Sequence, residues 1–183
     1  MKTDARVKYT KMVIKESLLK LLAEKPIKKV TVKEICELAQ INRATFYLHY
    51  RDPYDLFEQI ENELFEDLSS TVAAKQGDIS TLIKEVFKII GKNIELCQVL
   101  FSENGDKMFL QRIMDISREQ HIADLQRQYP NASRTQLDYM YEFTTSGCVA
   151  VVAQWVRSGM QDTPLELGRM IKTVRETWLG PFK

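Results

Sequence analysis

The sequence predicts an all-α protein, with a short three-helix head at the N-terminus and a longer helical bundle after it. Apolar residues recur with the 3.6-residue period of amphipathic helices along most of the 183 residues. The 7 glycines and 5 prolines lie mostly between these periodic segments, where they mark turns. Capping-box patterns that begin at Thr31, Ser133 and Thr163 mark helix starts. We therefore expect two domains, residues 1–52 and residues 53–183.

The composition is that of an ordinary water-soluble globular protein, with 44% hydrophobic and 28% charged residues. No apolar run reaches the roughly 20 residues that a membrane helix needs, and no signal peptide is visible at the N-terminus. The three cysteines are far apart without Cys-x-x-Cys spacing, which argues against a disulfide framework and against a zinc site. We expect a cytoplasmic protein with no membrane contact and no metal.

Motifs for catalysis are missing from the sequence. It contains 2 histidines and has no His-Glu-x-x-His, no Gly-x-Ser-x-Gly, no P-loop and no Gly-x-Gly-x-x-Gly. The usual acid-base, metal and phosphate-binding arrangements are therefore absent. We predict no enzymatic activity, no catalytic residue and no cofactor.

Charge is distributed unevenly along the chain. Residues 1–55 carry 12 Lys or Arg and 7 Asp or Glu, whereas the remaining residues are net negative, which leaves a net charge of +1 for the whole chain. A positive head on a neutral or acidic body is the electrostatic pattern of a nucleic-acid-binding protein. Chance bias in a helical domain gives the same pattern, so the charge is only weak support for this interpretation.

The segment from Thr31 to Asp55 predicts two short helices that meet at a tight turn, followed by the start of a third. The Thr31 hydroxyl and the Glu34 carboxylate would cap the first helix reciprocally, as a capping box does. Asn42 is a favourable N-cap for the second helix. Two helices joined within about three residues predict a helix-turn-helix.

Each of these two helices has an apolar side that we expect to face the core of the head. The inward residues are Ile35, Leu38 and Ala39 in the first helix, and Phe46 and Tyr50 in the second. Arg43, Ala44, Tyr47 and Leu48 fall on other sides of the second helix, where they are available to a partner. Such a helix suits the DNA major groove, although an ordinary solvated face would have the same pattern.

The residues of this second helix resemble a known family. The run Ile-Asn-Arg-Ala-Thr-Phe-Tyr-Leu-His-Tyr at residues 41–50 is similar to the DNA-binding domain of TetR-type transcription regulators, whose pattern is roughly Gly-Val-Ser-x-x-Thr-Phe-Tyr-x-His-Phe. The sequence departs from that family at Gln40, where Gly is usual in the turn, and at Pro53, where many members have Lys. Gln40 must therefore avoid a positive φ or carry the strain of one.

The resemblance implies that the protein binds double-stranded DNA through this region. Lys33 and Arg43, with Ala44 beside them, would face base edges, and Arg43 is suited to the paired acceptors of guanine. Phosphate contacts are implied for Thr31, Thr45, Tyr47 and His49. For His49, an ordinary surface histidine is the alternative.

The rest of the chain is helical by the same hydrophobic period. It predicts helices over residues 9–24, 53–73, 79–97, 108–128 and 134–158, and a last helix from residue 164 up to Gly180. Residues 75–78 predict a boundary between two of these helices. The last two helices are apolar on more sides than one subunit can cover, since Gln154 is the one strongly polar residue between Phe143 and Val156. We expect them to pair with their copies as a homodimer interface.

A second, looser resemblance lies in the C-terminal part. The spacing of Trp155 and Gly159, the run Thr-Pro-Leu-Glu at residues 163–166 and the pair Asn104-Gly105 are similar to a Gram-positive TetR subclass that includes the activator of dihydroxyacetone kinase operons. This resemblance implies control either by a small-molecule effector or by a protein co-regulator that binds the body. The residues do not separate these two, nor do they specify the operator, the regulated genes, or repression against activation.

An effector pocket would lie among the body helices, because the interiors of helical bundles are common ligand sites. Its candidate lining residues, chosen by helix and residue type, are Phe65, Phe87, Met108, Phe109, Tyr139 and Phe143. The alternative is that most of them belong to the ordinary core.

Overall fold

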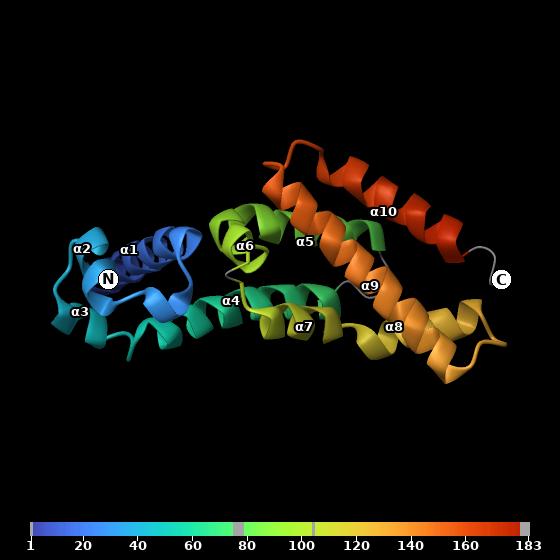
Figure 1. Ribbon diagram of the computed structural model, residues 1–183, viewed down its shortest axis with the longest axis horizontal. Helices are drawn as coiled ribbons and strands as arrows, with labels where there is room; N and C mark the ends of the chain where they lie inside the picture. The colour runs from blue at the N-terminus through green and yellow to red at the C-terminus, as the bar shows by residue number, and fades with distance from the viewer. Residues whose placement is uncertain (1, 75–78, 104, 180–183) are drawn as a thin grey trace. The chain divides into compact units, whose positions relative to one another are not determined.

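The computed structural model describes residues 2–74, 79–103 and 105–179, and within these ranges it contains ten α-helices, one 3-10 turn and no strand (Figure 1). The all-α prediction is therefore confirmed. The predicted boundary at residues 75–78 lies outside the described residues.

The chain forms two compact units. Unit 1 comprises Met1–Glu66 and Glu95–Asp106, and unit 2 comprises Asp67–Ile94 and Lys107–Lys183. The division falls within one helix, α4 (Pro53–Ala74), which therefore contributes to both units. A functional boundary between residues 52 and 53 stays a prediction about where DNA binding ends and control begins.

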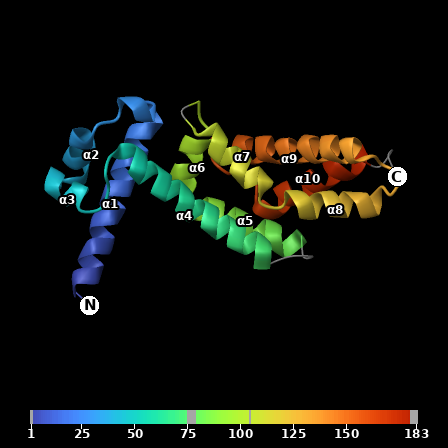
Figure 2. The ribbon, with the colours of Figure 1, turned by 90° about the horizontal axis from the view of Figure 1, so that it is seen from below.

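Unit 1 is built on the long first helix. It contains α1 (Lys2–Glu24), the turn Ile27–Lys29, α2 (Val32–Ala39), α3 (Arg43–Tyr47), the first part of α4, and most of α6 (Ile94–Leu100). Helix α1 packs on α2, and α2 packs on α3. Figure 2 shows the first turns of α1 standing clear of α2 and α3.

The core of unit 1 follows from the apolar stripe of α1. Ile14, Leu18 and Leu22 recur every four residues, so they share one face of the helix, and all three are fully buried. Ile35 of α2 and Phe46 of α3 are also fully buried. Burial of one such side chain stabilises the fold by about 1.5–3 kcal/mol, so this small core is sufficient to hold two short helices in place.

The capping box at the start of α2 forms as predicted. The Glu34 amide donates to the Thr31 hydroxyl over 3.3 Å, and the Thr31 amide donates to the Glu34 carboxylate over 3.0 Å. The Lys25 ammonium binds the other carboxylate oxygen. Together, the hydrogen bond from Lys25 and then those from Thr31 lower the pKa of Glu34 to about 2. This charged group therefore links the end of α1 to the beginning of α2.

The sequence left two alternatives for Gln40, to avoid a positive φ or to carry the strain of one. The structure shows the second. Gln40 has φ 52° and ψ 43°, which is the left-handed region that glycine adopts without cost. The Ile41 amide donates to the Cys36 carbonyl over 3.0 Å, and the Gln40 amide donates to the Glu37 carbonyl over 3.4 Å. This is a Schellman motif, which ends α2 and turns the chain into α3.

Unit 2 is a helical bundle dominated by α9 (Arg134–Arg157) and α10 (Pro164–Leu179). Its other elements are the second part of α4, α5 (Ile79–Lys92), α7 (Lys107–Asp115) and α8 (Arg118–Gln128). Helix α10 packs on α5 and α9, and α8 packs on α9. Figure 1 shows α9 and α10 running side by side.

Aromatic side chains anchor α9 in unit 2. The ring of Trp155 meets that of Phe87 on α5 edge to face, with 4.8 Å between the ring centroids, and the Trp155 indole donates to the Asp162 carbonyl over 2.8 Å. Tyr141 is buried and donates its hydroxyl to the Met114 carbonyl. A cluster around it joins α8 to α9 and consists of Ile122, Leu125, Tyr129, Leu137, Met140 and Tyr141.

Two helices predicted as continuous are each divided in the structure. The predicted segment 79–97 breaks at Asn93, whose side-chain amide donates to the Ile89 carbonyl over 3.0 Å, competing with the helical backbone. The predicted segment 108–128 breaks at residues 116–117, between α7 and α8. Hydrophobic periodicity did not reveal either break, because apolar residues continue across both.

The prediction that Leu38 faces the core is also wrong, since its side chain is 51% exposed. Helix α2 buries Ile35, Cys36 and Ala39 instead. These three lie on a narrower stripe of the helix, and Leu38 falls outside it.

We predict that Gln40→Gly stabilises the protein. Glycine removes the cost of a side chain at positive φ, so the free energy of unfolding should rise by about 1 kcal/mol. Urea unfolding of the full chain measures the change. Gln40→Ala is the matched control, because alanine keeps the Cβ atom and should give no such gain; an equal gain from both variants would show that the backbone at Gln40 is unstrained.

Candidate nucleic-acid interface

Helix α3 has one buried side and one exposed side, as the sequence predicts. Phe46 is 0% exposed and Tyr50 is buried, whereas Tyr47 is 57% exposed and Leu48 is 79% exposed. The first-turn residues Arg43 and Ala44 are exposed as well. Helix α3 and its C-cap therefore present a cation, a small side chain, an aromatic ring and an aliphatic side chain outward.

Side-chain contacts define the geometry of this five-residue helix. The Asn42 carboxamide oxygen accepts the Thr45 amide over 2.8 Å and the Thr45 hydroxyl over 3.0 Å, which confirms Asn42 as the N-cap. The Phe46 ring contacts the rings of Tyr47 and Tyr50, at centroid distances of 5.6 and 5.8 Å. The cap and the ring contacts thus fix the backbone that carries the exposed residues.

His49 lies just beyond α3 and is half-buried. Its ring centroid is 6.2 Å from that of Tyr50, and its amide donates to the Phe46 carbonyl over 3.0 Å. The backbone turn thus holds the imidazole at the edge of the α3 surface.

Helix α2 contributes the remaining predicted DNA-binding residues. Lys33 is exposed and forms an ion pair with Glu37 one turn further on, with 3.7 Å between nitrogen and oxygen. A pair this exposed contributes a few tenths of a kcal/mol, so the ammonium group is readily redirected to another anion. Thr31 is exposed, and its hydroxyl donates to the Glu34 carboxylate over 2.8 Å. Figure 2 shows α2 and α3 adjacent on the same side of α1.

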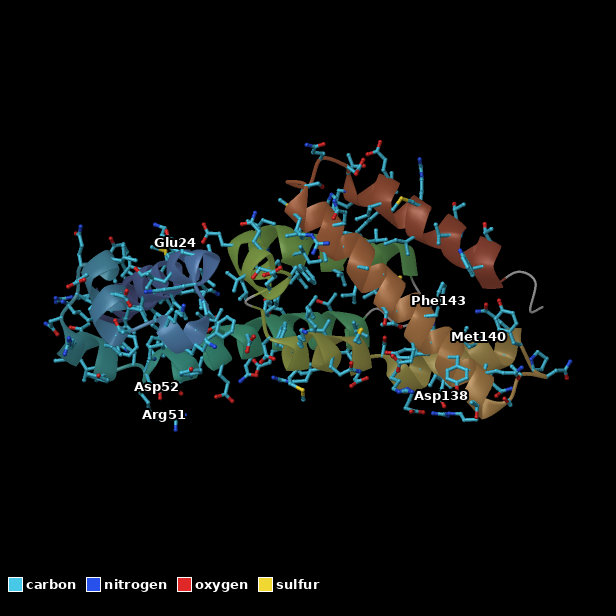
Figure 3. The ribbon with its side chains drawn as sticks, viewed as in Figure 1. Glu24, Arg51, Asp52, Asp138, Met140 and Phe143 are labelled. Carbon is cyan, nitrogen blue, oxygen red and sulfur yellow. The ribbon has the colours of Figure 1, made fainter. Side chains whose placement is uncertain are left out.

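The loop that follows α3 is closed by acidic side chains. Asp52 caps α4 by accepting the Asp55 amide over 2.9 Å, and Pro53 opens the helix, as predicted. The Asp55 carboxylate accepts the Arg51 amide over 2.8 Å and the Arg51 guanidinium over 3.1 Å. The Arg51 amide is the main cause that lowers the pKa of Asp55. Arg51 and Asp52 are labelled in Figure 3, where they mark this corner of unit 1.

The six residues named as effector candidates do not line one common cavity. Phe87 and Phe109 are buried, Phe65 is half-buried, and Met108 and Tyr139 are exposed. Phe143, labelled in Figure 3, lines a cavity of about 140 Å³ between α9 and α10. The other residues around this cavity are Thr144, Gly147, Cys148, Val151, Met170, Ile171, Val174 and Trp178.

The sequence feature that predicts a subunit interface also coincides with this cavity. The small and apolar residues of α9 and the stripe of α10 predicted a subunit interface, and the cavity lies between those same two helices.

No helix of the described residues is long and apolar enough to cross a membrane.

A helix-turn-helix with an exposed second helix, followed in the chain by a helical bundle, is the architecture of a DNA-binding transcription regulator. Residues 14–60 match the family model for bacterial regulatory proteins of the tetR family, and residues 77–176 match a model for the C-terminal region of transcriptional regulators. The second model alone covers more than half of the chain. The chain belongs to the TetR family of DNA-binding transcription regulators.

Known relatives agree with this assignment. Over 69 residues the chain is 33% identical to the uncharacterized HTH-type transcriptional regulator YxbF of Bacillus subtilis (strain 168), a match that spans 38% of this chain and 18% of that protein. Among solved structures, a TetR transcriptional regulator from Streptococcus agalactiae is 24% identical with a TM-score of 0.64, covering 96% of this chain and 98% of that one.

A second solved structure, the dihydroxyacetone kinase operon activator DhaS, is 16% identical with a TM-score of 0.60, covering 95% of this chain and 98% of that one. At these identities the two solved structures establish the fold that this chain shares with them.

Proposed function

We propose that the protein binds a palindromic DNA operator as a homodimer and that a small molecule bound to its body controls this binding. The observation that carries the DNA-binding part is α3, whose inner side is anchored by fully buried Phe46 and whose outer side is exposed. The major groove of B-DNA is wide enough to admit such a helix. Two copies would reach half-sites about one helical turn, roughly 34–36 Å, apart.

The seven candidate residues divide between base reading and phosphate binding. Arg43 and Ala44 lie in the first turn of α3, where a recognition helix approaches base edges. Lys33 would also reach a base edge once its ion pair with Glu37 breaks. Arg43 has the fork of donors that matches guanine O6 and N7. Phosphate contacts are assigned to Thr31, Thr45, Tyr47 and His49.

Phosphate binding by Thr31 and Thr45 would break hydrogen bonds that their hydroxyls already make. Their hydroxyls donate to Glu34 and to Asn42, so binding to phosphate requires these donations to be redirected.

We predict that Arg43→Ala reduces specific binding much more than nonspecific binding. Loss of one bidentate base contact should weaken binding to the selected operator by about tenfold to a hundredfold, with little change for a scrambled duplex. The operator is first selected from random duplex DNA, and affinities are then measured by fluorescence anisotropy at one salt concentration.

Tyr47→Phe is the control, because loss of a phosphate contact should weaken both duplexes alike. Equal losses for Arg43→Ala on both duplexes would remove Arg43 as a base reader.

The proposed subunit interface is the outward face of α9 and α10. Four large apolar side chains on it are each about half exposed in the subunit: Phe143, Met170, Val174 and Trp178. The rings of Phe143 and Trp178 contact each other, with 5.1 Å between their centroids. Monomeric proteins rarely expose a contiguous apolar surface of this kind. Packing against the same helices of a second copy would bury these side chains in a four-helix arrangement.

We predict that Val174→Glu converts the dimer to monomers, because the interface would have to bury an unpaired carboxylate. Thr173→Glu is the matched control. It adds the same charge to the neighbouring exposed position, which lies off the apolar stripe, and should leave the dimer intact. Sedimentation velocity measures both. A Val174→Glu protein that stays dimeric would place the interface elsewhere.

The proposed effector is a small apolar molecule in the cavity between α9 and α10. The walls of this cavity are almost entirely apolar, and Gly147 leaves room in it, since a Cβ atom added there would meet nothing within 4 Å. A molecule bound there would change how the two proposed interface helices pack. It would therefore shift the separation of the two DNA-binding heads by favouring one body arrangement over another.

We predict that a screen of small apolar molecules finds one that raises the melting temperature, because a ligand that binds the folded state stabilises it. Gly147→Leu, which adds a bulky side chain at the wall of the cavity, should weaken this stabilisation. Gly91→Leu is the control, because Gly91 is also open and helical but belongs to α5. Stabilisation that persists in Gly147→Leu would move the site, and stabilisation by a protein alone would favour a co-regulator.

A further inference from the structure

Leu48 has the highest exposed fraction of any large apolar side chain among the described residues, at 79%. It directly follows the last residue of α3 and keeps a right-handed helical conformation, with φ −69° and ψ −20°. Its amide donates to the Ala44 carbonyl over 3.1 Å, so its side chain continues the surface of the helix. This position has an ordered backbone geometry and almost no packing of its own.

The fold does not use the Leu48 side chain. The turn after α3 is secured by Phe46 and Tyr50, whose rings contact each other in the core, and by the backbone bonds to Phe46 and Ala44. A lone exposed leucine needs no explanation on most protein surfaces. Here, however, it lies on the outward side of the helix that is proposed to enter the groove.

Two rows of side chains run along that outward side. Residues four apart on a helix are neighbours, so Arg43 and Tyr47 form one row and Ala44 and Leu48 form the next. The first row is polar and aromatic, whereas the second is wholly apolar. The small Ala44 lets the backbone approach the DNA closely, and Leu48 projects beyond it.

The major groove offers one apolar group to such a row, the C5-methyl of thymine. We infer that Leu48, with Ala44 beside it, packs against a thymine methyl in each half-site and so selects a T·A pair there. A cytosine at that position would place its amino group beneath an aliphatic side chain that cannot accept a hydrogen bond. The inference rests on the proposed function, in which α3 lies in the major groove.

The position of this thymine follows from helix geometry. Leu48 is five residues beyond Arg43, which corresponds to about 7.5 Å along the helix axis. Successive base pairs are about 3.4 Å apart, so the thymine lies within about two base pairs of the guanine read by Arg43.

The test replaces each thymine of the selected operator, in both half-sites, by deoxyuridine, which removes only the methyl group. The wild-type protein should lose affinity at one symmetric pair of thymines, by about fourfold for each methyl contact removed. Leu48→Ala should bind the unmodified operator more weakly by a similar factor and should show no further loss with deoxyuridine at that pair. Leu48→Met, which keeps an apolar side chain, should retain the sensitivity.

Leu38→Ala is the matched control, because Leu38 is also exposed but belongs to α2. This variant should remain as sensitive to deoxyuridine as the wild-type protein. If no thymine is sensitive in the wild type, or if Leu48→Ala keeps the full sensitivity, the inference is overturned while operator binding stands. Absence of any preferred duplex would overturn the proposed function itself, and the inference with it.

Discussion

The proposed DNA-binding surface depends on the burial of a single aromatic ring. Helix α3 has five residues, far fewer than the number at which an isolated helix becomes stable in water. Its existence therefore depends on Phe46, which is fully buried against the core of unit 1, and on the Asn42 cap at its start. Because the inner side is anchored in this way, every other residue of the helix can be polar or exposed without loss of the fold. The proposed recognition surface is the side of α3 opposite Phe46.

Side-chain caps position the helices that surround this anchor. Thr31 starts α2, Asn42 starts α3 and Asp52 starts α4, each by accepting a backbone amide three residues ahead. Ser133 and Thr163 do the same for α9 and α10. Each cap is worth about 1 kcal/mol and acts within one turn, so helix starts in this protein are defined locally. The end of α2 at Gln40 differs from these helix starts, since backbone hydrogen bonds hold that turn at a positive φ.

The body differs from the head in what it leaves uncovered. Both units expose some large apolar side chains, but in unit 2 Phe143, Met170, Val174 and Trp178 gather around one cavity between α9 and α10. A helix that belongs to both units, α4, connects the two by continuous backbone. The proposed control of DNA binding would act through this helix, because no other described helix extends so far into both units.

The helix type, the starts of most helices and the inward position of Phe46 could be predicted because they depend on residues within four positions of one another. The same local rules did not determine the exposure of Leu38, the breaks at Asn93 and residues 116–117, or the positive φ of Gln40. The exposure of Leu38 depends on which remote segments cover α2, and the break at Asn93 involves a competition between its side chain and the backbone that periodicity does not register. The φ of Gln40 depends on the backbone hydrogen bonds that close its turn. The cavity between α9 and α10 could not be predicted from either helix alone, since it forms only where the two helices pack together.

Local patterns in the sequence predicted the class of fold and gave candidates for contact with DNA, whereas contacts between distant segments set which side chains are exposed and where α9 and α10 leave space. The physical reason is that caps and helix periods act over one or two turns, while burial is a property of contacts between segments far apart in the chain.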